Sequence, residues 1–224
     1  MCNHYRKGQP VVEWSQVRLG GVAVASAFKD IAEHTYPKYP APIVTQRDGV
    51  RELVEKSWGI PIAIRGVAGK SVTKPVTNAR NDRLNGSTWR NATRERRCLI
   101  PAIGYYEPGL GPVGAKGEIL FTVRERPLFF FAGLWENDSF TMVTTEPNEF
   151  VSRFHDRMPV VLEDADTEEW LGDEPLPMDR LAALCRGLPS ESLLHDDLPA
   201  KLRIVRPSKP APPDDSPMLF PFFD

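Results

Sequence analysis

The stretch from Ile119 to Thr145 decides the fold class, because three apolar runs follow one another there with few polar residues between them. The runs are ILFTVR (119–124), LFFFAGLWE (128–136) and FTMVTT (140–145). They are rich in the aromatic and β-branched residues that favour strands. The sequence therefore predicts three consecutive strands joined by turns, a β-meander.

The elements on both sides of this stretch are expected to be short. Strands are predicted at Ala41–Gln46, Val50–Ile64, Cys98–Glu107 and Leu202–Val205. Helices are predicted at Val22–Glu33, Asn85–Arg97, Thr167–Leu171 and Met178–Arg186, and a loop at the Gly-, Ser- and Thr-rich residues 65–77. The chain has 22 prolines in 224 residues, about twice the average usage, which also favours short elements. We therefore predict an α+β fold, a single domain of mostly antiparallel β-sheet with peripheral helices.

The domain is expected to cover residues 1–206 and to be followed by a tail. Residues 207–224 are rich in Pro and Asp and end in MLFPFFD. Because exposing three phenylalanines is costly, such an end more often packs on its own domain. The alternative is that the tail docks a replication or repair partner, although no motif in it identifies one.

The composition excludes several classes of protein. The formal net charge is −2, so any anion site must be a local basic patch. The three widely spaced cysteines, Cys2, Cys98 and Cys185, exclude a disulfide framework and a CxxC metal site. No apolar run approaches the roughly 20 residues of a membrane span, and MCNHYRKGQP (1–10) lacks the apolar core of a signal peptide. We expect a soluble, cytoplasmic monomer with no metal and no membrane contact.

Cys2 directly follows the initiator methionine, which is removed when the next residue is small. The chain would then begin with a cysteine, whose amine and thiol lie on neighbouring carbons. An α-amino group has a pKa of about 7.7–8.0, so much of it is a neutral nucleophile at pH 7. Such an aminothiol attacks an aldehyde to form an imine, which the thiol closes to a thiazolidine. The alternative is that Cys2 has no chemical role and is simply a small residue near a frayed terminus.

Two further residues are candidates for proton transfer. His155 lies in RFHDRMP (153–159), between charged residues and a short apolar run. Glu107 ends the apolar run GYYE (104–107), where partial burial would raise its pKa. Each can also be an ordinary surface residue.

Basic residues gather between residues 80 and 97, after the motif Asn78-Ala79-Arg80. They are Arg80, Arg83, Arg90, Arg94, Arg96 and Arg97, with Trp89 among them and only two acidic residues. A basic stretch with an aromatic residue is typical of a surface that binds phosphates or single strands. A solvated helix face would have the same composition.

Taken in order, several motifs resemble the family of SOS-response-associated peptidases (SRAP), also called abasic-site processing proteins. The resemblance runs from Cys2 to about Leu171. It rests on segments that include MCN (1–3), WGIP (58–61), NAR (78–80), RCLIPA (97–102), GYYE (104–107), AGLW (132–135) and HDRMPVVL (155–162). It implies the family's fold, an α+β domain with curved antiparallel sheets and a groove for DNA.

The resemblance also implies a function, crosslinking to abasic sites in single-stranded DNA. Cys2 would be the nucleophile, and Asn78 would hold it or the sugar by hydrogen bonds. Glu107 would move protons during imine formation and ring closure, and His155 would assist opening of the sugar and release of the link, a lyase-type activity. No cofactor would be needed. The protein would associate with the nucleoid when it is bound to DNA.

Four further residues would contact DNA if the resemblance holds. Arg80 and Arg157 would bind the phosphates beside the lesion, and Trp58 would form an aromatic wall or stack on a base. His4 stands where the family often has arginine, so that phosphate contact would be lost or would depend on pH. After Glu107 the family usually has tryptophan, whereas this chain has Pro108.

Two other functions fit the same residues. A thiol peptidase, a hydrolase as in the family's name, would use Cys2 with His155, with Glu107 as a further candidate, and would not need a free α-amine. A non-catalytic module for single-stranded DNA would leave Cys2 idle. Blocking the α-amine would abolish crosslinking but could spare a thiol peptidase. A non-catalytic module would form no covalent species with any substrate.

Overall fold

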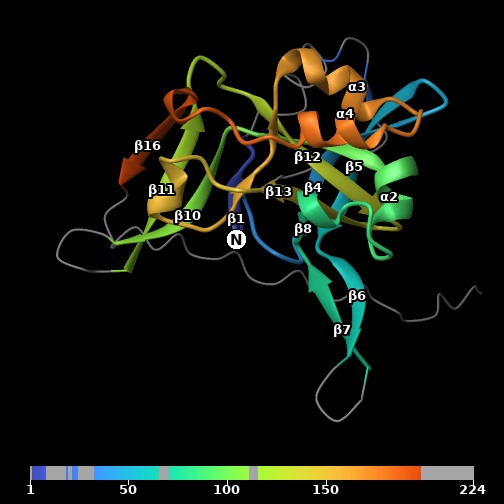
Figure 1. Cartoon of the computed structure of the whole chain (residues 1–224), viewed down its shortest axis with the longest axis horizontal. Coiled ribbons are helices and arrows are strands. Elements are labelled where there is room, and N and C mark those ends of the chain that lie inside the picture. Colours follow the sequence, from blue (N-terminus) through green and yellow to red (C-terminus); the bar gives the residue numbers. More distant parts are fainter. Residues whose placement is uncertain are drawn as a thin grey trace, which may run out of the picture.

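Two β-sheets form the frame of the protein. The computed structural model describes residues 2–8, 19, 22–24, 33–65, 71–110 and 116–197. The five-stranded sheet has the order β16-β11-β10-β1-β3, and all its pairings are antiparallel. Its strands are β1 (His4–Arg6), β3 (His34–Thr35), β10 (Gly104–Leu110), β11 (Lys116–Val123) and β16 (Leu193–Asp197). It lies on the left of Figure 1.

The nine-stranded sheet curves until it closes on itself. Its main path is β14-β13-β12-β9-β4-β5-β2, and β13 also pairs with β5 in parallel, which joins two strands from distant places in that order. The strands are β2 (Ala23–Val24), β4 (Pro40–Arg47), β5 (Val50–Trp58), β8 (Asn78–Arg80), β9 (Arg97–Ala102), β12 (Phe129–Glu136), β13 (Ser139–Thr145), β14 (Met158–Pro159) and β15 (Val161–Leu162). Two strands lie off this main path: β8 pairs with β13 in parallel, and β15 pairs with β12 in antiparallel orientation.

Both faces of the curved sheet are buried, which explains the long apolar run at residues 128–135. Phe129 and Phe131 point into a core shared with the five-stranded sheet. Phe130 and Ala132 point to a second core on the other face, where Trp170 and Leu181 pack. Alternate side chains of β12 thus pack into two different cores, so neither face of this strand is polar.

Short helices surround the sheets. The α-helices are α2 (Arg90–Glu95), α3 (Thr167–Leu171) and α4 (Met178–Leu184). The 3₁₀ helices are η2 (Asn81–Arg83), η4 (Val151–Arg153), η5 (Asp164–Asp166) and η6 (Ser190–Ser192). Figure 1 shows α3 and α4 side by side over the nine-stranded sheet. The predicted α+β fold with mostly antiparallel sheets is confirmed.

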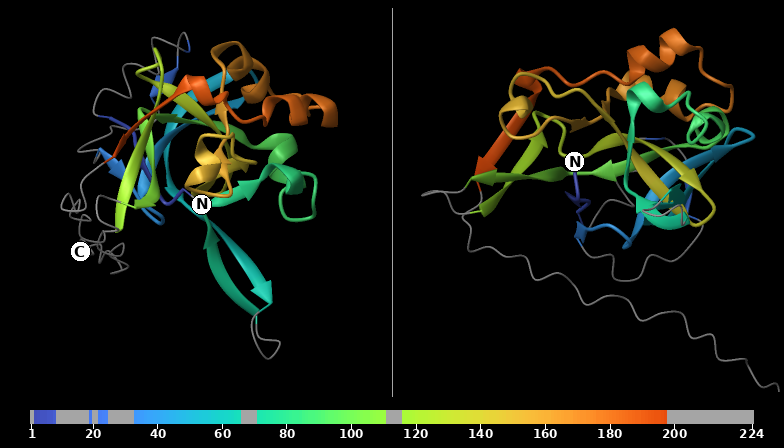
Figure 2. Two further views of the ribbon diagram at one scale, coloured as in Figure 1. Left: turned by 60° about the vertical axis from the view of Figure 1, so that its left-hand side comes forward. Right: turned by 60° about the horizontal axis from the view of Figure 1, so that its bottom comes forward.

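A β-hairpin of β6 (Ile60–Arg65) and β7 (Ser71–Val76) projects from the body, as Figures 1 and 2 show. Its base is fixed by Gly59, which has a φ of 125° and leaves no room for a side chain, since a Cβ there would lie 2.9 Å from Cβ of Pro75. β7 runs through Thr77 into β8. The hairpin base is therefore adjacent to Asn78, the first residue of β8.

Several sequence predictions are corrected by the structure. The three apolar runs are strands, but they are not a meander, because β11 pairs with β10 and β16 in the other sheet while β12 pairs with β9 and β13. Residues 71–76 are a strand and not part of a loop. The helix predicted at Val22–Glu33 is wrong at residues 23–24, which form β2, and the one predicted at Asn85–Arg97 is shortened to α2.

Some predictions fall outside the described residues. These are most of the predicted helix at 22–33, the strand at Leu202–Val205 and the tail at 207–224. The strand predicted at Cys98–Glu107 is two strands, β9 and β10, which belong to different sheets. The other predicted strands and helices appear near their predicted positions. The short strands β1, β3, β8, β14 and β15, and also β16, were not predicted.

Candidate active site

Cys2 lies in the core shared by the two sheets, two residues before the start of β1. Its side chain is buried, with 1% exposed. Its thiol donates to the backbone carbonyl oxygen of His4 at 3.4 Å. Burial raises the pKa of the thiol well above its ordinary value, and the nearby charge of Glu107 raises it further. The thiol is therefore protonated at neutral pH.

Asn78 holds Cys2 from the other sheet. It begins β8, which pairs in parallel with β13, opposite Met142. Its side-chain Nδ2 donates to the carbonyl oxygen of Cys2 at 3.1 Å and to Oγ1 of Thr77 at 2.8 Å. Its Oδ1 is buried and has no hydrogen-bond partner in the described part of the chain. This oxygen is therefore an acceptor available to an incoming group.

Glu107 supplies a buried carboxyl group next to Cys2. It lies on β10, only 1% exposed. Burial raises its pKa from the ordinary 4.5 to about 7, and the positive charge of the chain's N-terminal amino group lowers it in part. A carboxyl group with this pKa exchanges protons readily at neutral pH.

His155 lies after η4, one residue from an exposed aspartate. Its Nδ1 lies 2.8 Å from Oδ1 of Asp156 and 3.0 Å from the backbone nitrogen of Arg157. Burial lowers the pKa of His155, the N-terminal charge lowers it further, and Asp156 partly offsets both. The imidazole is therefore mostly neutral at pH 7 and is suited to proton transfer.

The structure brings Cys2, Asn78 and Glu107 of the four predicted catalytic residues together. Asn78 contacts Cys2 directly, and the charge of Glu107 acts on the Cys2 thiol. The charges of Asp156 and of the N-terminal amino group act on both His155 and Glu107.

Tyr105 is a neighbour that the sequence reasoning missed. It is fully buried and its pKa is raised by burial and by the charges of Glu107 and Cys2. The signal was present, because residues two apart on a strand face the same side, as Tyr105 and Glu107 do.

The two arginines predicted to bind phosphates differ in exposure. The Arg80 side chain is 53% exposed and pairs with both carboxylate oxygens of Asp82 at 2.9 Å. Arg157 is buried and donates to Oε1 of Glu146 at 2.8 Å, to Oδ1 of Asn81 at 2.8 Å and to a backbone carbonyl. Arg80 is thus accessible, whereas Arg157 is held by protein groups.

The other two residues predicted to contact DNA are enclosed by the protein. Trp58 is fully buried, and its Nε1 donates to the carbonyl oxygen of Thr77 at 2.9 Å. It supports the segment that carries Asn78, and its ring has no face open to a base. His4 is 2% exposed, with its ring stacked between Tyr36 and Tyr106. Their predicted DNA contacts would require these side chains to move.

The basic stretch at residues 80–97 is not one continuous surface. Arg97 is buried and donates to the backbone carbonyl oxygens of Thr93, Trp170 and Gly172, among others. Trp89 is also buried. These two residues stabilise the packing of α2 and α3 on the sheet, so any nucleic-acid surface must use the remaining arginines.

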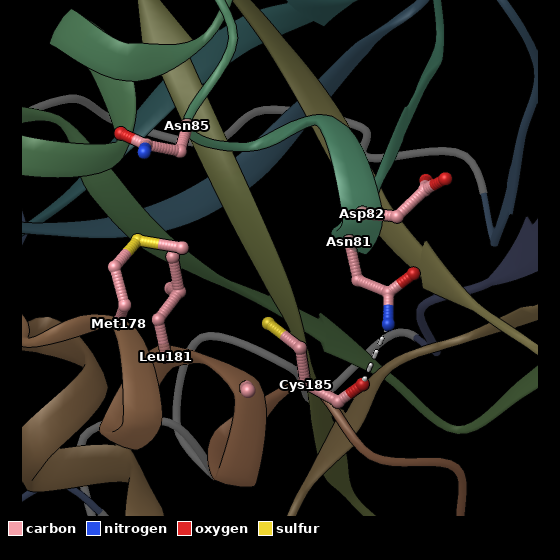
Figure 3. A pocket seen from close by; sticks show the side chains of 7 residues that line it. Asn81, Asp82, Asn85, Met178, Leu181 and Cys185 are labelled. Atoms are coloured by element: carbon pink, nitrogen blue, oxygen red, sulfur yellow. Dashed lines mark hydrogen bonds between the residues drawn. The ribbon is translucent and has the colours of Figure 1, made fainter.

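A pocket of about 230 Å³ lies between η2 and α4 (Figure 3). It is lined by Asn81, Asp82, Asn85, Met178, Leu181, Ala182 and Cys185. The side chain of Asn81 donates to the carbonyl oxygen of Cys185 at 3.4 Å and accepts from Arg157. Asn81 therefore connects this pocket to the Arg157 hydrogen bonds.

Two features are absent from the described residues, a membrane-spanning helix and a metal-binding cluster. None of their helices is long and apolar enough to cross a membrane. In the same part of the chain, no group of three or more His, Cys, Asp and Glu side chains is arranged to hold a metal ion.

Several proteins with similar sequences are named abasic site processing proteins. Abasic site processing protein YoqW of Bacillus subtilis is 34% identical over 119 residues, 49% of this chain and 53% of that protein. YoaM of the same organism is 35% identical over 119 residues, 49% and 52% of the two chains. Abasic site processing protein YMR114C of Saccharomyces cerevisiae is 30% identical over 152 residues, 63% and 40%. The chain thus spans about half the length of the curated bacterial relatives it matches.

Solved structures share the fold. A protein from Bordetella bronchiseptica superposes with a TM-score of 0.68 and 23% identity, over 88% of this chain and 99% of that one. A protein from Bacteroides thetaiotaomicron has a TM-score of 0.70 and 22% identity, over 88% and 92%. The family model described as SOS response associated peptidase (SRAP) matches residues 1–200. The chain therefore belongs to the SRAP family.

Proposed function

We propose that this protein recognises abasic sites in single-stranded DNA and forms a covalent thiazolidine crosslink to them through Cys2. The observation that carries the proposal is the placement of Cys2, which is held by Asn78 and lies beside the carboxyl group of Glu107. The names of the related bacterial and yeast proteins supply the substrate.

The reaction starts at the amine of Cys2 after Met1 is removed. An abasic sugar in its open form presents an aldehyde. The amine adds to the aldehyde carbon, and the resulting carbinolamine loses water to give an imine. The thiol then adds across the C=N bond, with sulfur going to carbon and its proton to nitrogen. One C–N bond and one C–S bond form, one water leaves, and no atom changes its net oxidation level.

Glu107 and His155 are suited to the proton transfers of this reaction. With a pKa near 7, Glu107 can give a proton to the departing hydroxyl group and accept one from the thiol. The neutral imidazole of His155 can accept the proton of the anomeric hydroxyl group as the sugar opens and return it to the ring oxygen. The unpartnered Oδ1 of Asn78 can accept from the α-amine or from a sugar hydroxyl. In reverse, the same groups would release the link.

Arg80 is the side chain best placed to bind a phosphate beside the lesion. It is exposed, and it would exchange its ion pair with Asp82 for the phosphate. A surface ion pair of this kind contributes little stability, so the exchange is inexpensive. Arg157 would act indirectly, by holding the segment after β8 in place.

A thiol peptidase is less well supported. A peptidase needs a thiolate, and burial together with Glu107 raises the pKa of the Cys2 thiol. In the crosslinking reaction the amine is the first nucleophile, so a protonated thiol is no obstacle at that stage. Removal of Met1 is the peptide cleavage that the proposed function requires. We further propose that the protein acts as a monomer and associates with the nucleoid when it is bound to DNA.

The test is a denaturing gel with a short abasic oligonucleotide. The wild-type protein is expected to give a heat-stable shifted band. Cys2→Ala keeps the amine, so it should give a band only when borohydride traps the imine. An oligonucleotide with a tetrahydrofuran site, which has no aldehyde, should give no band with either protein. A stable band with Cys2→Ala, or none with wild-type protein lacking Met1, would overturn the proposal.

A further inference from the structure

His4 lies at the centre of a closely packed group of aromatic and ionisable side chains. Its ring is stacked between Tyr36 and Tyr106, with centroid separations of 4.3 and 3.9 Å. Its Nδ1 lies 3.3 Å from Oε2 of Glu118, and its Nε2 lies 2.9 Å from Nδ1 of His34. Both faces and both nitrogens of this buried imidazole are thus engaged by the protein.

These contacts of His4 stabilise β1, which is a very short strand. β1 has three residues and pairs with β10 and β3. The side chain of His4 also contacts the same two strands, through Tyr106 on β10 and His34 on β3. It contacts a third strand, β11, through Glu118. Cys2 lies two residues before the start of this strand, and its thiol donates to the carbonyl oxygen of His4. The position of Cys2 therefore depends on how firmly β1 is held.

The His4–His34 contact tolerates only a limited number of protons. At 2.9 Å, one ring nitrogen must donate and the other must accept. A neutral pair, or a pair with one extra proton, keeps one lone pair for this bond. A second extra proton would make two N–H groups face each other, and the bond would break.

The groups around the pair resist a second proton. The carboxylate of Glu118 lies 3.3 Å from Nδ1 of His4 and can accept a hydrogen bond from it. Next to His34, Arg6 and Glu33 form an ion pair with each other. Burial lowers the pKa of His34, and the charge of His4 lowers it further. The second proton is therefore bound only below the ordinary histidine pKa of about 6.5.

We propose that His4 is a positioning residue that fixes strand β1 and with it the Cys2 nucleophile, and that a second proton on the His4–His34 pair releases this strand. The consequence for crosslinking rests on the proposed function. The effect on the strand itself does not, so the two are tested by separate measurements.

The first measurement is hydrogen exchange of the β1 amides relative to those of β12, without DNA, at about pH 7.5 and about pH 5, on either side of the ordinary histidine pKa. In the wild-type protein the relative protection of β1 is expected to fall about tenfold at the lower pH, since a charge-assisted hydrogen bond is lost. His4→Phe keeps a ring between the tyrosines but loses both bonds, so β1 should be weakly protected at both pH values. Equal protection of β1 in the two proteins at both pH values would overturn the proposal.

Glu118→Gln provides a milder variant, because this side chain is 45% exposed. Without the carboxylate the pair binds protons less tightly, so the acid loss of β1 protection should move to lower pH. Glu191→Gln, an exposed substitution on η6, is the matched control and should not move it. A shift to higher pH, or the same shift in the control, would contradict the assignment.

The second measurement compares crosslinking rate with affinity for an undamaged oligonucleotide. His4→Phe is expected to slow single-turnover crosslinking about tenfold, the same factor as for the strand, and to leave the affinity unchanged. A wild-type protein that forms no crosslink would refute the proposed function and leave the exchange result standing. A wild-type protein that crosslinks, with an equally fast His4→Phe variant, would refute the positioning role.

Discussion

Replacing Glu107 with glutamine is expected to change how the stability of the protein depends on pH. Burial raises the pKa of Glu107 from 4.5 to about 7 in the folded protein. Between these values the folded chain holds a proton that the unfolded chain has lost, so the free energy of unfolding falls as pH rises. The fall is about 1.4 kcal/mol per pH unit and about 3 kcal/mol in all, and it is complete above the folded-state pKa.

The assay is urea unfolding of wild-type protein and Glu107→Gln over a pH series. Glutamine is neutral throughout, so the difference in free energy of unfolding between variant and wild type should grow by about 3 kcal/mol from about pH 4.5 to about pH 8.5. Any constant effect of packing cancels in this comparison. Glu191→Gln, at an exposed site, should show no such growth. Parallel curves for wild type and Glu107→Gln would refute the argument that the folded site holds a neutral carboxyl group.

Three other substitutions have defined outcomes. Gly133→Ala should lower the free energy of unfolding by about 1–3 kcal/mol, because its Cβ would lie 2.8 Å from Cδ1 of Ile100; an unchanged urea midpoint would contradict this packing. Arg157→Lys should destabilise the protein by about 1–3 kcal/mol, because lysine cannot keep the bond to Glu146 and the backbone bond together; an unchanged thermal midpoint would argue against it. Arg80→Ala should leave stability within about 0.5 kcal/mol of wild type and reduce the salt dependence of binding to single-stranded DNA by about 0.7 in the log–log slope. Fluorescence anisotropy at several salt concentrations measures that slope, and an unchanged slope would remove Arg80 from the interface.

The fold class follows from local patterns, but the sheet assignment does not. The apolar runs at residues 119–124 and 128–136 predict strands correctly, because strand propensity is local. That the first run pairs with β10 and β16, while the second enters the other sheet, depends on contacts between distant parts of the chain. The glycine, serine and threonine residues likewise made residues 65–77 resemble a loop, although 71–76 pair with β6.

More of the candidate site than of its surroundings could be predicted from the sequence. The chemistry of an N-terminal aminothiol identified Cys2, and the family resemblance added Asn78, Glu107 and His155. The structure brings Cys2, Asn78 and Glu107 together, and the roles of all four residues stay predictions.

The surroundings of His4 could not be predicted in this way. His34 and Glu118 lie 30 and 114 residues away from it along the chain. Only the pairing of β1 with its neighbours places them around the imidazole. The sequence therefore predicted a surface contact for a side chain that the fold encloses.

In the proposed crosslink, both nucleophiles of Cys2 bond to one carbon of the abasic sugar. The decisive measurement is peptide mass spectrometry of the crosslinked, nuclease-digested protein. We expect an N-terminal peptide beginning at Cys2, with a mass equal to the peptide plus the sugar fragment minus one water. Because the ring occupies both the amine and the thiol, this peptide should resist borohydride reduction and iodoacetamide. An adduct on a lysine, or one on Cys2 whose thiol can still be alkylated, would exclude a thiazolidine at Cys2.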